Sequence, residues 1–359
     1  MIWMFITLGL MIGFMLVLIF TMPSFGRQLS SFLGNAVMFA LLGVGTAVCL
    51  NKGTVNLALT GITGLCACLA ALLSEVDGAM VVSTFVALFL GAALGALTGL
   101  FTIQSRRNVL LVTGISSLII GTFFSTIAVL ISSYSGIRAK VDRDTTLVFS
   151  IIFLILAAAA AVLGGLGRSF STNRGDRAPR PGGGMRFLWT TIAGALAGLA
   201  GILMVARIGG YQPNSYTNLL ELDIIPILLL AGVLIANVRH SAGEGIFGGV
   251  SVIFASIIFS AITMLMSRAS IDAYYQRLLI MILSLLLLIP NILICRGQKR
   301  TPQPQGSWAY QQYPPQEPAY PEYPQQEPSY QEYQPQEAAF QEYQPQEPEG
   351  YQPPQYPNA

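Results

Sequence analysis

Hydrophobic residues fill most of the first 296 positions and fall into ten runs that polar stretches separate. A helix that spans a bilayer needs roughly 20 apolar residues. We therefore expect an all-α integral membrane protein with about ten transmembrane helices, some of them short or broken. The expected spans are 2–21, 33–50, 54–73, 80–103, 109–132, 147–166, 188–206, 222–237, 246–266 and 278–294.

Two of these spans are irregular. The span 54–73 contains an asparagine and two threonines, and the span 222–237 is short, with Pro226 near its start. Polar or interrupted spans are tolerated where they face a protein interior or a water-filled cavity. Both are candidates for a translocation path, although a polar side chain such as Asn56 can also simply bond a neighbouring helix. The candidate path residues are Asn56, Thr60, Thr63, Thr113, Ser116 and Ser117.

Composition and charge support the membrane assignment and give an orientation. Only 10% of the 359 residues are charged and 53% are hydrophobic, whereas soluble domains are about a quarter charged. With the N-terminus in the cytoplasm, 12 of the 19 basic residues lie inside and 7 outside, as the positive-inside rule favours. Both termini are then cytoplasmic, and 74–78 and 209–223 lie outside. The span 2–21 has no basic residue before it and no cleavage site after it, so we expect a retained helix.

Two further segments stand apart from the apolar runs. The inner loop 166–187 carries five arginines and exceeds the usual connection of about 4–6 residues. It is either a positive-inside retention loop or a docking surface for a cytoplasmic partner. The tail 297–359 is rich in proline, glutamine, glutamate and tyrosine, and QEYQPQE recurs at 331–337 and 341–347. We expect a disordered cytoplasmic tail, which either solubilises the protein or binds a partner through its tyrosines.

Candidate chemistry excludes several classes of protein. The chain lacks a Gly-rich loop ending in Gly-Lys-Ser/Thr, so it does not hydrolyse ATP by the usual P-loop. Its acidic residues lie at the edges of spans, whereas an ion-coupled carrier normally buries them as relays. The four cysteines and the single histidine lack the spacing of a metal site. We therefore expect no catalytic residue, no metal, no cofactor and no nucleic-acid partner, and the energy for transport would come from elsewhere.

Small residues recur at helical spacing in three spans. The sequences are GAALGALTG at 91–99, GALAGLAG at 194–201 and GGVSVIFAS at 248–256. Glycine, alanine or serine at every fourth position lets helix backbones approach closely. We expect a compact bundle of helices that pack through these faces.

Several segments resemble permeases of ABC importers. ARIGGYQPNSYTNLLELDIIPILLLAG at 206–232 is similar to the corresponding segment of ribose and other monosaccharide permeases, as are 194–207, 243–249 and 272–289. GTVNLALTGITGLCA at 53–67 and RNVLLVTGISSLIIGTFFS at 107–125 are closer to nucleoside permeases that work with basic-membrane-protein lipoproteins. The resemblance covers about 33–296, with 194–232 the most specific part, and does not include the tail.

The resemblance implies a permease subunit in a bacterial inner membrane, with ATP hydrolysis on a separate ATPase chain. Its partners would be the lipid bilayer, a second permease subunit in a homo- or heterodimer, a cytoplasmic ATPase and an extracytoplasmic solute-binding protein. The loop 166–187 would be the coupling loop, and 209–223 an outer gate and docking site, unless it is a plain turn. The implied coupling residues are Arg174, Asp176, Arg177 and Arg180. The implied gate or docking residues are Tyr211, Gln212, Asn214, Glu221 and Asp223.

Three departures from the family pattern qualify this expectation. The sequence NRGDRAPRPGGGM replaces the helix-forming coupling segment, Thr60 stands where nucleoside permeases have glutamate, and 233–245 replaces a tight glycine turn. A diverged half of a heterodimer would accommodate all three.

The expected solute is a small polar molecule, with a nucleoside slightly favoured over a pentose-type sugar. The alternatives are an energy-independent channel or facilitator, with which no ATPase would co-purify, and a membrane scaffold that presents the tail. A scaffold would lose its function when 301–359 is deleted.

Overall fold

The computed structural model describes residues 2–22, 25–74, 80–104, 109–132, 137–139, 141, 143–166, 182–212, 220–233 and 242–297. Within these ranges the chain forms ten helices and one pair of two-residue strands. The helices are α1 (Ile2–Thr21), α2 (Phe25–Asn51), α3 (Leu59–Leu73), α4 (Met80–Gln104), α5 (Val109–Ile131), α6 (Arg143–Gly165), α7 (Gly183–Ile208), α8 (Leu220–Leu230), α9 (Ala242–Arg268) and α10 (Ala273–Gly297). The strands are β1 (Ile137–Arg138) and β2 (Gly210–Tyr211).

The helices confirm the expected all-α membrane class. Seven of them are long and apolar enough to cross a bilayer by length and composition. The two irregular spans are short helices, since α3 has 15 residues and α8 has 11. The expected span 222–237 is too long: α8 ends at Leu230, because Gly232 adopts a left-handed φ of 70° and Val233 donates its N–H to Leu228 O. This is the hydrogen-bond pattern of a glycine-terminated helix.

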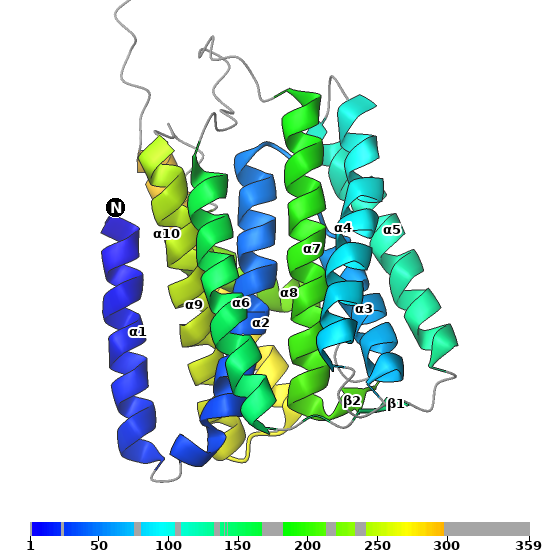
Figure 1. The fold of residues 1–359 in the computed structure, drawn as a ribbon. Coiled ribbons are helices and arrows are strands. Elements are labelled where there is room, and N and C mark those ends of the chain that lie inside the picture. Colours follow the sequence, from blue (N-terminus) through cyan, green and yellow to red (C-terminus); the bar gives the residue numbers. More distant parts are fainter. Residues whose placement is uncertain are drawn as a thin grey trace, which may run out of the picture. The chain divides into compact units, whose positions relative to one another are not determined.

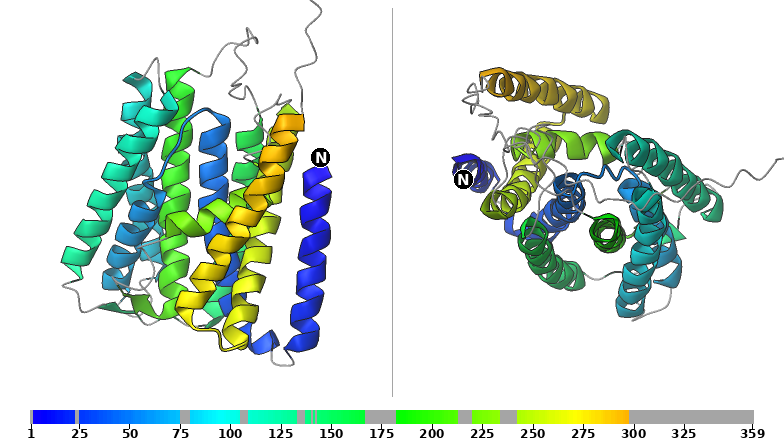
Figure 2. Two further views of the ribbon diagram at one scale, coloured as in Figure 1. Left: turned by 180° about the vertical axis from the view of Figure 1, so that it is seen from behind. Right: turned by 90° about the horizontal axis from the view of Figure 1, so that it is seen from above.

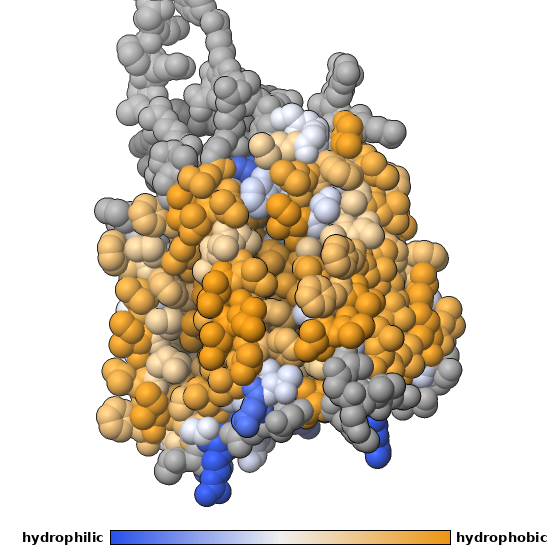
Figure 3. Space-filling model, viewed as in Figure 1, coloured by the Kyte–Doolittle hydropathy of each residue, from blue (hydrophilic) through white to orange (hydrophobic). Residues whose placement is uncertain are grey.

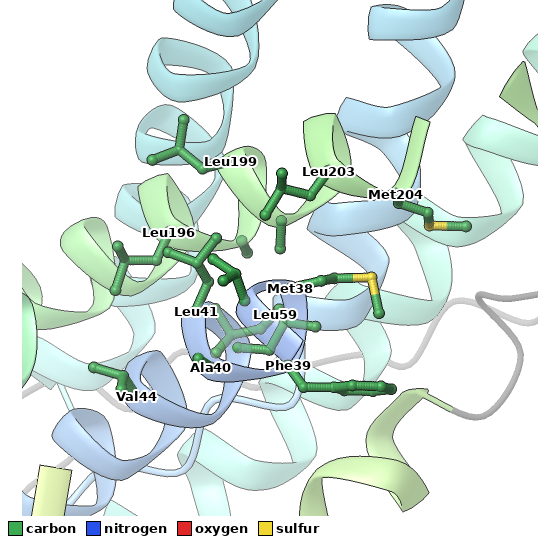
Figure 4. Packing of buried hydrophobic residues seen from close by; sticks show 14 of the residues in the cluster. Met38, Phe39, Ala40, Leu41, Val44, Leu59, Leu196, Leu199, Leu203 and Met204 are labelled. Atoms are coloured by element: carbon green, nitrogen blue, oxygen red, sulfur yellow. The ribbon is translucent and has the colours of Figure 1, made fainter. Parts of the chain in front are cut away.

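Helix α7 is the centre of the described bundle. It packs against α2, α3, α4 and α6, and Figure 2 shows it surrounded by other helices when viewed from above. The core between α2 and α7 is apolar: Met38 and Leu41 of α2 lie close to Leu199 and Leu203 of α7, with Leu59 of α3 beside them (Figure 4). The centre of the bundle is therefore close-packed and apolar.

Helices α4 and α7 meet through their small residues, as the sequence pattern predicts. A Cβ atom added at Gly95 would lie 2.5 Å from Thr190 O of α7, and Gly91 and Gly194 face each other's backbone in the same way. Glycine is required at such a contact because any side chain would separate the two helices.

The outer face of the bundle suits a lipid environment. Large apolar side chains are exposed along α1, α4, α5, α6 and α10, and Figure 3 shows hydrophobic residues over most of one face, with hydrophilic residues near its lower end. The start of α1 and the end of α10 lie at the same end of the bundle (Figures 1 and 2). This arrangement agrees with an even number of spans and with both ends of the helical region on one side of the membrane.

Candidate functional site

The polar residues of the expected span 54–73 surround a break between α2 and α3. Helix α2 ends because Gly53 adopts a φ of 78°, which glycine tolerates without strain, and Thr54 N–H bonds Cys49 O at 2.9 Å. The Thr54 hydroxyl donates to the same carbonyl at 3.0 Å. Residues 54–57 then run without helical structure until α3 begins at Leu59.

Two hydroxyls of α5 hold the backbone of this break. Val55 N–H donates to Thr113 Oγ1 at 3.1 Å, and Leu57 N–H donates to Ser117 Oγ at 2.9 Å. Ser117 lies within 3.3 Å of Val55 O as well, so its hydroxyl can bond both sides of the break. Residues four apart share one helix face, so Thr113 and Ser117 replace the hydrogen bonds that a helix would have made here. Non-helical backbone at membrane depth requires such partners.

Glycines bring α3 and α5 into backbone contact beside the break. A Cβ atom added at Gly121 would lie 2.9 Å from Ala58 Cα and 3.2 Å from Leu57 O, and one at Gly61 would overlap the Gly121 backbone. A Cβ at Gly114 would meet Val55 at an ordinary 3.8 Å. The break is therefore fixed against α5 by close packing at Gly121 and by side-chain hydrogen bonds nearer the start of α5.

Asn56 is the polar side chain at the centre of the break. It is only 3% exposed, and its Oδ1 accepts from Ala58 N–H at 3.1 Å, which makes an Asx turn leading into α3. Its Nδ2 has no hydrogen-bond partner among the described residues. A buried amide donor without a partner is costly, by about 1–3 kcal/mol, so this donor is a candidate for contact with a group from outside the chain.

The remaining path candidates take different positions. Thr60 is buried in the first turn of α3, close to Leu57 O. Thr63 is buried against α7, where its hydroxyl donates to Ala197 O at 3.1 Å or to its own helix. Ser116 lies on α5 beside Ser117, but its hydroxyl bonds Val112 O of its own helix at 2.7 Å. The structure thus brings Asn56, Thr113 and Ser117 together and places Ser116 away from them.

Lys52 lies at the start of the same break and was not among the candidate site residues. It is 1% exposed, its Nζ donates to Leu166 O at 3.0 Å, and it lies 5.9 Å from the ring centroid of Trp189. Burial lowers the pKa of its ammonium below the ordinary value, because loss of water disfavours the charged form. The only sequence signal for this contact was a lone lysine in the short turn between two apolar runs.

The outer stretch is anchored by a strand pair. Helix α7 ends at Gly209, with a left-handed φ of 74°, and β2 then pairs antiparallel with β1, placing Tyr211 opposite Ile137. Tyr211 is fully buried, whereas Gln212 is exposed and Asp223 in α8 is half-buried. A docking group must reach solvent, so Gln212 fits that role better than Tyr211. Asn214 lies outside the described residues, and so does the side chain of Glu221.

A second polar cluster joins four helices near the outer end of α7 and was not predicted. Arg207 of α7 donates to Asn35 Oδ1 of α2, and Asn35 Nδ2 donates to Ser260 Oγ of α9 at 3.3 Å. Thr146 of α6 adds a bond to Ala206 O at 3.3 Å. These residues are far apart in sequence, so only the fold shows that they meet.

The expected coupling residues and the tail cannot be placed. Arg174, Asp176, Arg177 and Arg180 lie outside the described residues, and so does the chain beyond Gly297. Leu166 directly follows the end of α6, and Gly182 directly precedes the start of α7. These are the described residues on either side of the loop. The coupling role of the loop and the disorder of the tail stay predictions.

Comparison with known proteins finds one kind of relative. The chain is 26% identical over 271 residues to the ribose import permease protein RbsC of Escherichia coli strain K12, and the match covers 70% of this chain and 81% of that protein. RbsC from Escherichia coli O6:H1 and O157:H7 gives the same values. No family model matches the chain. No solved structure matches it.

The similarity and the helices lead to the same coarse assignment. RbsC is a permease, and the match extends across most of both chains, while the described residues include seven helices suited to crossing a bilayer. Together these findings support a multi-pass transmembrane permease of the ABC type in a bacterial inner membrane, which is a transport component and not a catalytic enzyme.

Proposed function

We propose that this chain is the permease subunit of an ABC importer for a small polyhydroxylated solute of the pentose type. The observation that carries the proposal is the similarity to a ribose import permease over 81% of that protein. A homo- or heterodimeric partner, a cytoplasmic ATPase and an extracytoplasmic solute-binding protein would complete the transporter.

The break between α2 and α3 is our candidate for the solute path within this subunit. Asn56 has a buried amide donor without a partner among the described residues, and a sugar hydroxyl is a suitable acceptor for it. Thr113 and Ser117 would act indirectly, by holding the backbone on either side of Asn56. Gln212 and Asp223 are candidates for the outer docking surface.

A nucleoside is the second candidate solute. The resemblance of 53–67 and 107–125 to nucleoside permeases slightly favours this solute. The relatives found by comparison are ribose permeases, so we now place the pentose first. Nucleosides contain a ribose, and therefore both solutes offer similar hydroxyl groups.

Uptake by native cells tests the proposal and separates the two solutes. Labelled ribose and labelled guanosine would each be supplied to cells with the gene, without it, and with it restored. We expect loss of ribose uptake in the deletion strain and recovery on restoration. Selective loss of guanosine uptake would replace the pentose with a nucleoside. Unchanged uptake of both would overturn the pentose and nucleoside assignments.

The coupling role of 166–187 has its own test. Replacing Arg177 and Arg180 by glutamine should lower uptake while the protein still accumulates in the membrane, because the loop would no longer engage the ATPase. Arg268, which is exposed at the end of α9, provides the matched control, and Arg268→Gln should leave uptake intact. Normal uptake with both loop arginines replaced would remove the coupling assignment.

A further inference from the structure

Lys52 is buried more deeply than its chemistry favours. Lysine carries a compact, strongly hydrated charge and is almost never fully buried unless it is paired, yet Lys52 is 1% exposed. It is placed where α2 ends, immediately before Gly53 turns the chain into the break. A lysine at this position needs partners that hold its ammonium in place.

The partners of Lys52 come from the ends of α6 and α7. Its Nζ donates to Leu166 O at 3.0 Å, one residue beyond the last residue of α6. The same ammonium lies 5.9 Å from the ring centroid of Trp189, in the second turn of α7, within the range of a cation–π contact. In sequence, Leu166 and Trp189 flank the loop that connects α6 to α7.

Other contacts tie these helix ends together. Cys49 Sγ of α2 lies 3.9 Å from Trp189 O, and a Cβ atom added at Gly245 of α9 would lie 2.8 Å from Asn51 Nδ2 and 2.9 Å from Gly165 O. The ends of α2, α6 and α9 are thus in direct contact around Lys52. A displacement of the α6 end would change the position of Leu166 O, the acceptor of the Lys52 bond.

The chain between Lys52 and Asn56 is short and held at both ends. Only Gly53, Thr54 and Val55 separate them, and Val55 is fixed to Thr113. Thr54 between them is tied to the end of α2, because its N–H and its hydroxyl both bond Cys49 O, at 2.9 Å and 3.0 Å. A shift of the α2 end at Lys52 is therefore passed through Thr54 and Val55 to the backbone around Asn56.

We propose that Lys52 is a positioning residue that links the cytoplasmic ends of α6 and α7 to the α2–α3 break. When an ATPase moves these helix ends, the Lys52 contact transmits the movement to Asn56. The inference rests on the proposed function, because it needs an ATPase that acts on this end of the bundle. The inference adds the contacts through which a movement caused by the ATPase would reach the α2–α3 break.

A purely structural lysine would give a different result. If Lys52 only stabilises the fold, its loss lowers the amount of folded protein in the membrane, and the protein that remains keeps its nucleotide-dependent labelling. If it transmits movement, its loss removes the nucleotide-dependent change at the break and leaves the remaining protein otherwise intact. The readout must therefore follow the break itself.

The test uses membranes that contain the whole transporter and a cysteine introduced at Leu57, which is half-buried in the break. The rate of labelling with N-ethylmaleimide is measured without nucleotide and with ATP plus vanadate, and labelling of the chain without the added cysteine is subtracted. The variants are Lys52→Met, which removes the donor and the charge, and Lys52→Gln, which keeps a donor if Lys52→Met fails to accumulate. Arg268→Gln is the control for loss of a positive charge.

The chain with Lys52 and the control should show a nucleotide-dependent labelling rate. We expect Lys52→Met to reduce that dependence by roughly tenfold, since hydrogen bonds to charged groups are among the stronger ones. Equal dependence in Lys52→Met and in the unchanged chain would overturn the inference and leave the proposed function standing. Absence of any dependence in the unchanged chain would also overturn the inference, because the break would then not move with nucleotide, and uptake of labelled ribose by the same chain decides the proposed function separately.

Discussion

The helical bundle is interrupted near both of its ends, and the two interruptions are stabilised differently. At the outer end, β2 follows α7 and pairs with β1, so the hydrogen bonds there join backbone groups of two segments. One of them is the bond that Ala139 N–H donates to Gly209 O at 2.9 Å. At the α2–α3 break, side chains of α5 bond the backbone at Val55 and Leu57. Both solutions satisfy buried polar groups, which is the requirement that a membrane imposes.

The difference indicates which interruption can change. Backbone pairing needs no particular side chains, so the outer pair should tolerate substitution at an exposed position such as Arg138, whereas Gly209 and Gly210 are required by their positive φ. The inner break depends on two hydroxyls and one close glycine contact, so it is sensitive to sequence and can be rearranged by moving one helix. The α2–α3 break is therefore the better candidate for a path that opens and closes.

The largest effect on stability is expected at Gly121. A Cβ there would lie 2.9 Å from Ala58 Cα, so Gly121→Ala should force α3 and α5 apart and cost about 1–3 kcal/mol. Gly114 is on the same helix and would place its Cβ 3.8 Å from Val55, so Gly114→Ala should be nearly neutral. Thermal unfolding of both variants in detergent measures the difference, and equal midpoints would contradict the close contact.

A similar but more local effect is expected at Ser117. Ser117→Ala removes the acceptor for Leu57 N–H, and a buried donor left without a partner costs about 1–3 kcal/mol. Ser116→Ala, one position away, removes only a bond within α5 and should change the free energy of unfolding by less than about 0.5 kcal/mol. If the Ser116 variant is the less stable of the two, the break is not held as described.

A smaller effect is expected where α7 meets β2. Gly209 has a φ of 74°, and a non-glycine residue in that conformation costs about 1–2 kcal/mol. Gly209→Ala should therefore destabilise the protein by about 1 kcal/mol, and Gly209→Asn by less, because asparagine tolerates left-handed backbone. Unfolding midpoints that rank alanine above asparagine would contradict this assignment.

The smallest effect is expected for side chains of the outer strand pair. Arg138 is exposed and pairs with Gly210 through its backbone, so Arg138→Gln should change the free energy of unfolding by less than about 0.5 kcal/mol. A larger loss in the same unfolding measurement would show that this end also relies on side chains and would remove the contrast between the two interruptions.

The sequence predicted the helices better than the contacts between them. Apolar runs located all ten helices, and small residues at four-residue spacing identified the faces of α4 and α7 that meet. The irregular span 54–73 was recognised from Asn56 and its threonines, because polar residues interrupt the hydrophobic pattern visibly. Local pattern was sufficient for these features.

Features that depend on distant residues could not be predicted in the same way. Gly114 and Gly121 look alike in sequence, and only the position of α3 makes one of them indispensable. The pairing of Ile137 with Tyr211 and the bond of Lys52 to Leu166 O join residues 74 and 114 positions apart. Tyr211 is buried because it lies in the strand pair, and no hydrophobic periodicity in the sequence predicts these two-residue strands.

Ribose uptake by cells carrying a change at Asn56 tests the central claim most directly. Asn56→Ser keeps a side-chain oxygen that can accept from Ala58 N–H but removes the buried amide donor, and Ser116→Ala is the control on the same helix as Thr113 and Ser117. With equal amounts of protein in the membrane, we expect uptake of labelled ribose to fall about tenfold for Asn56→Ser, because a tenfold rate change corresponds to about 1.4 kcal/mol, within the value of one buried hydrogen bond. The control should match the unchanged protein. Equal uptake by both variants and the unchanged protein would show that the α2–α3 break does not line the path.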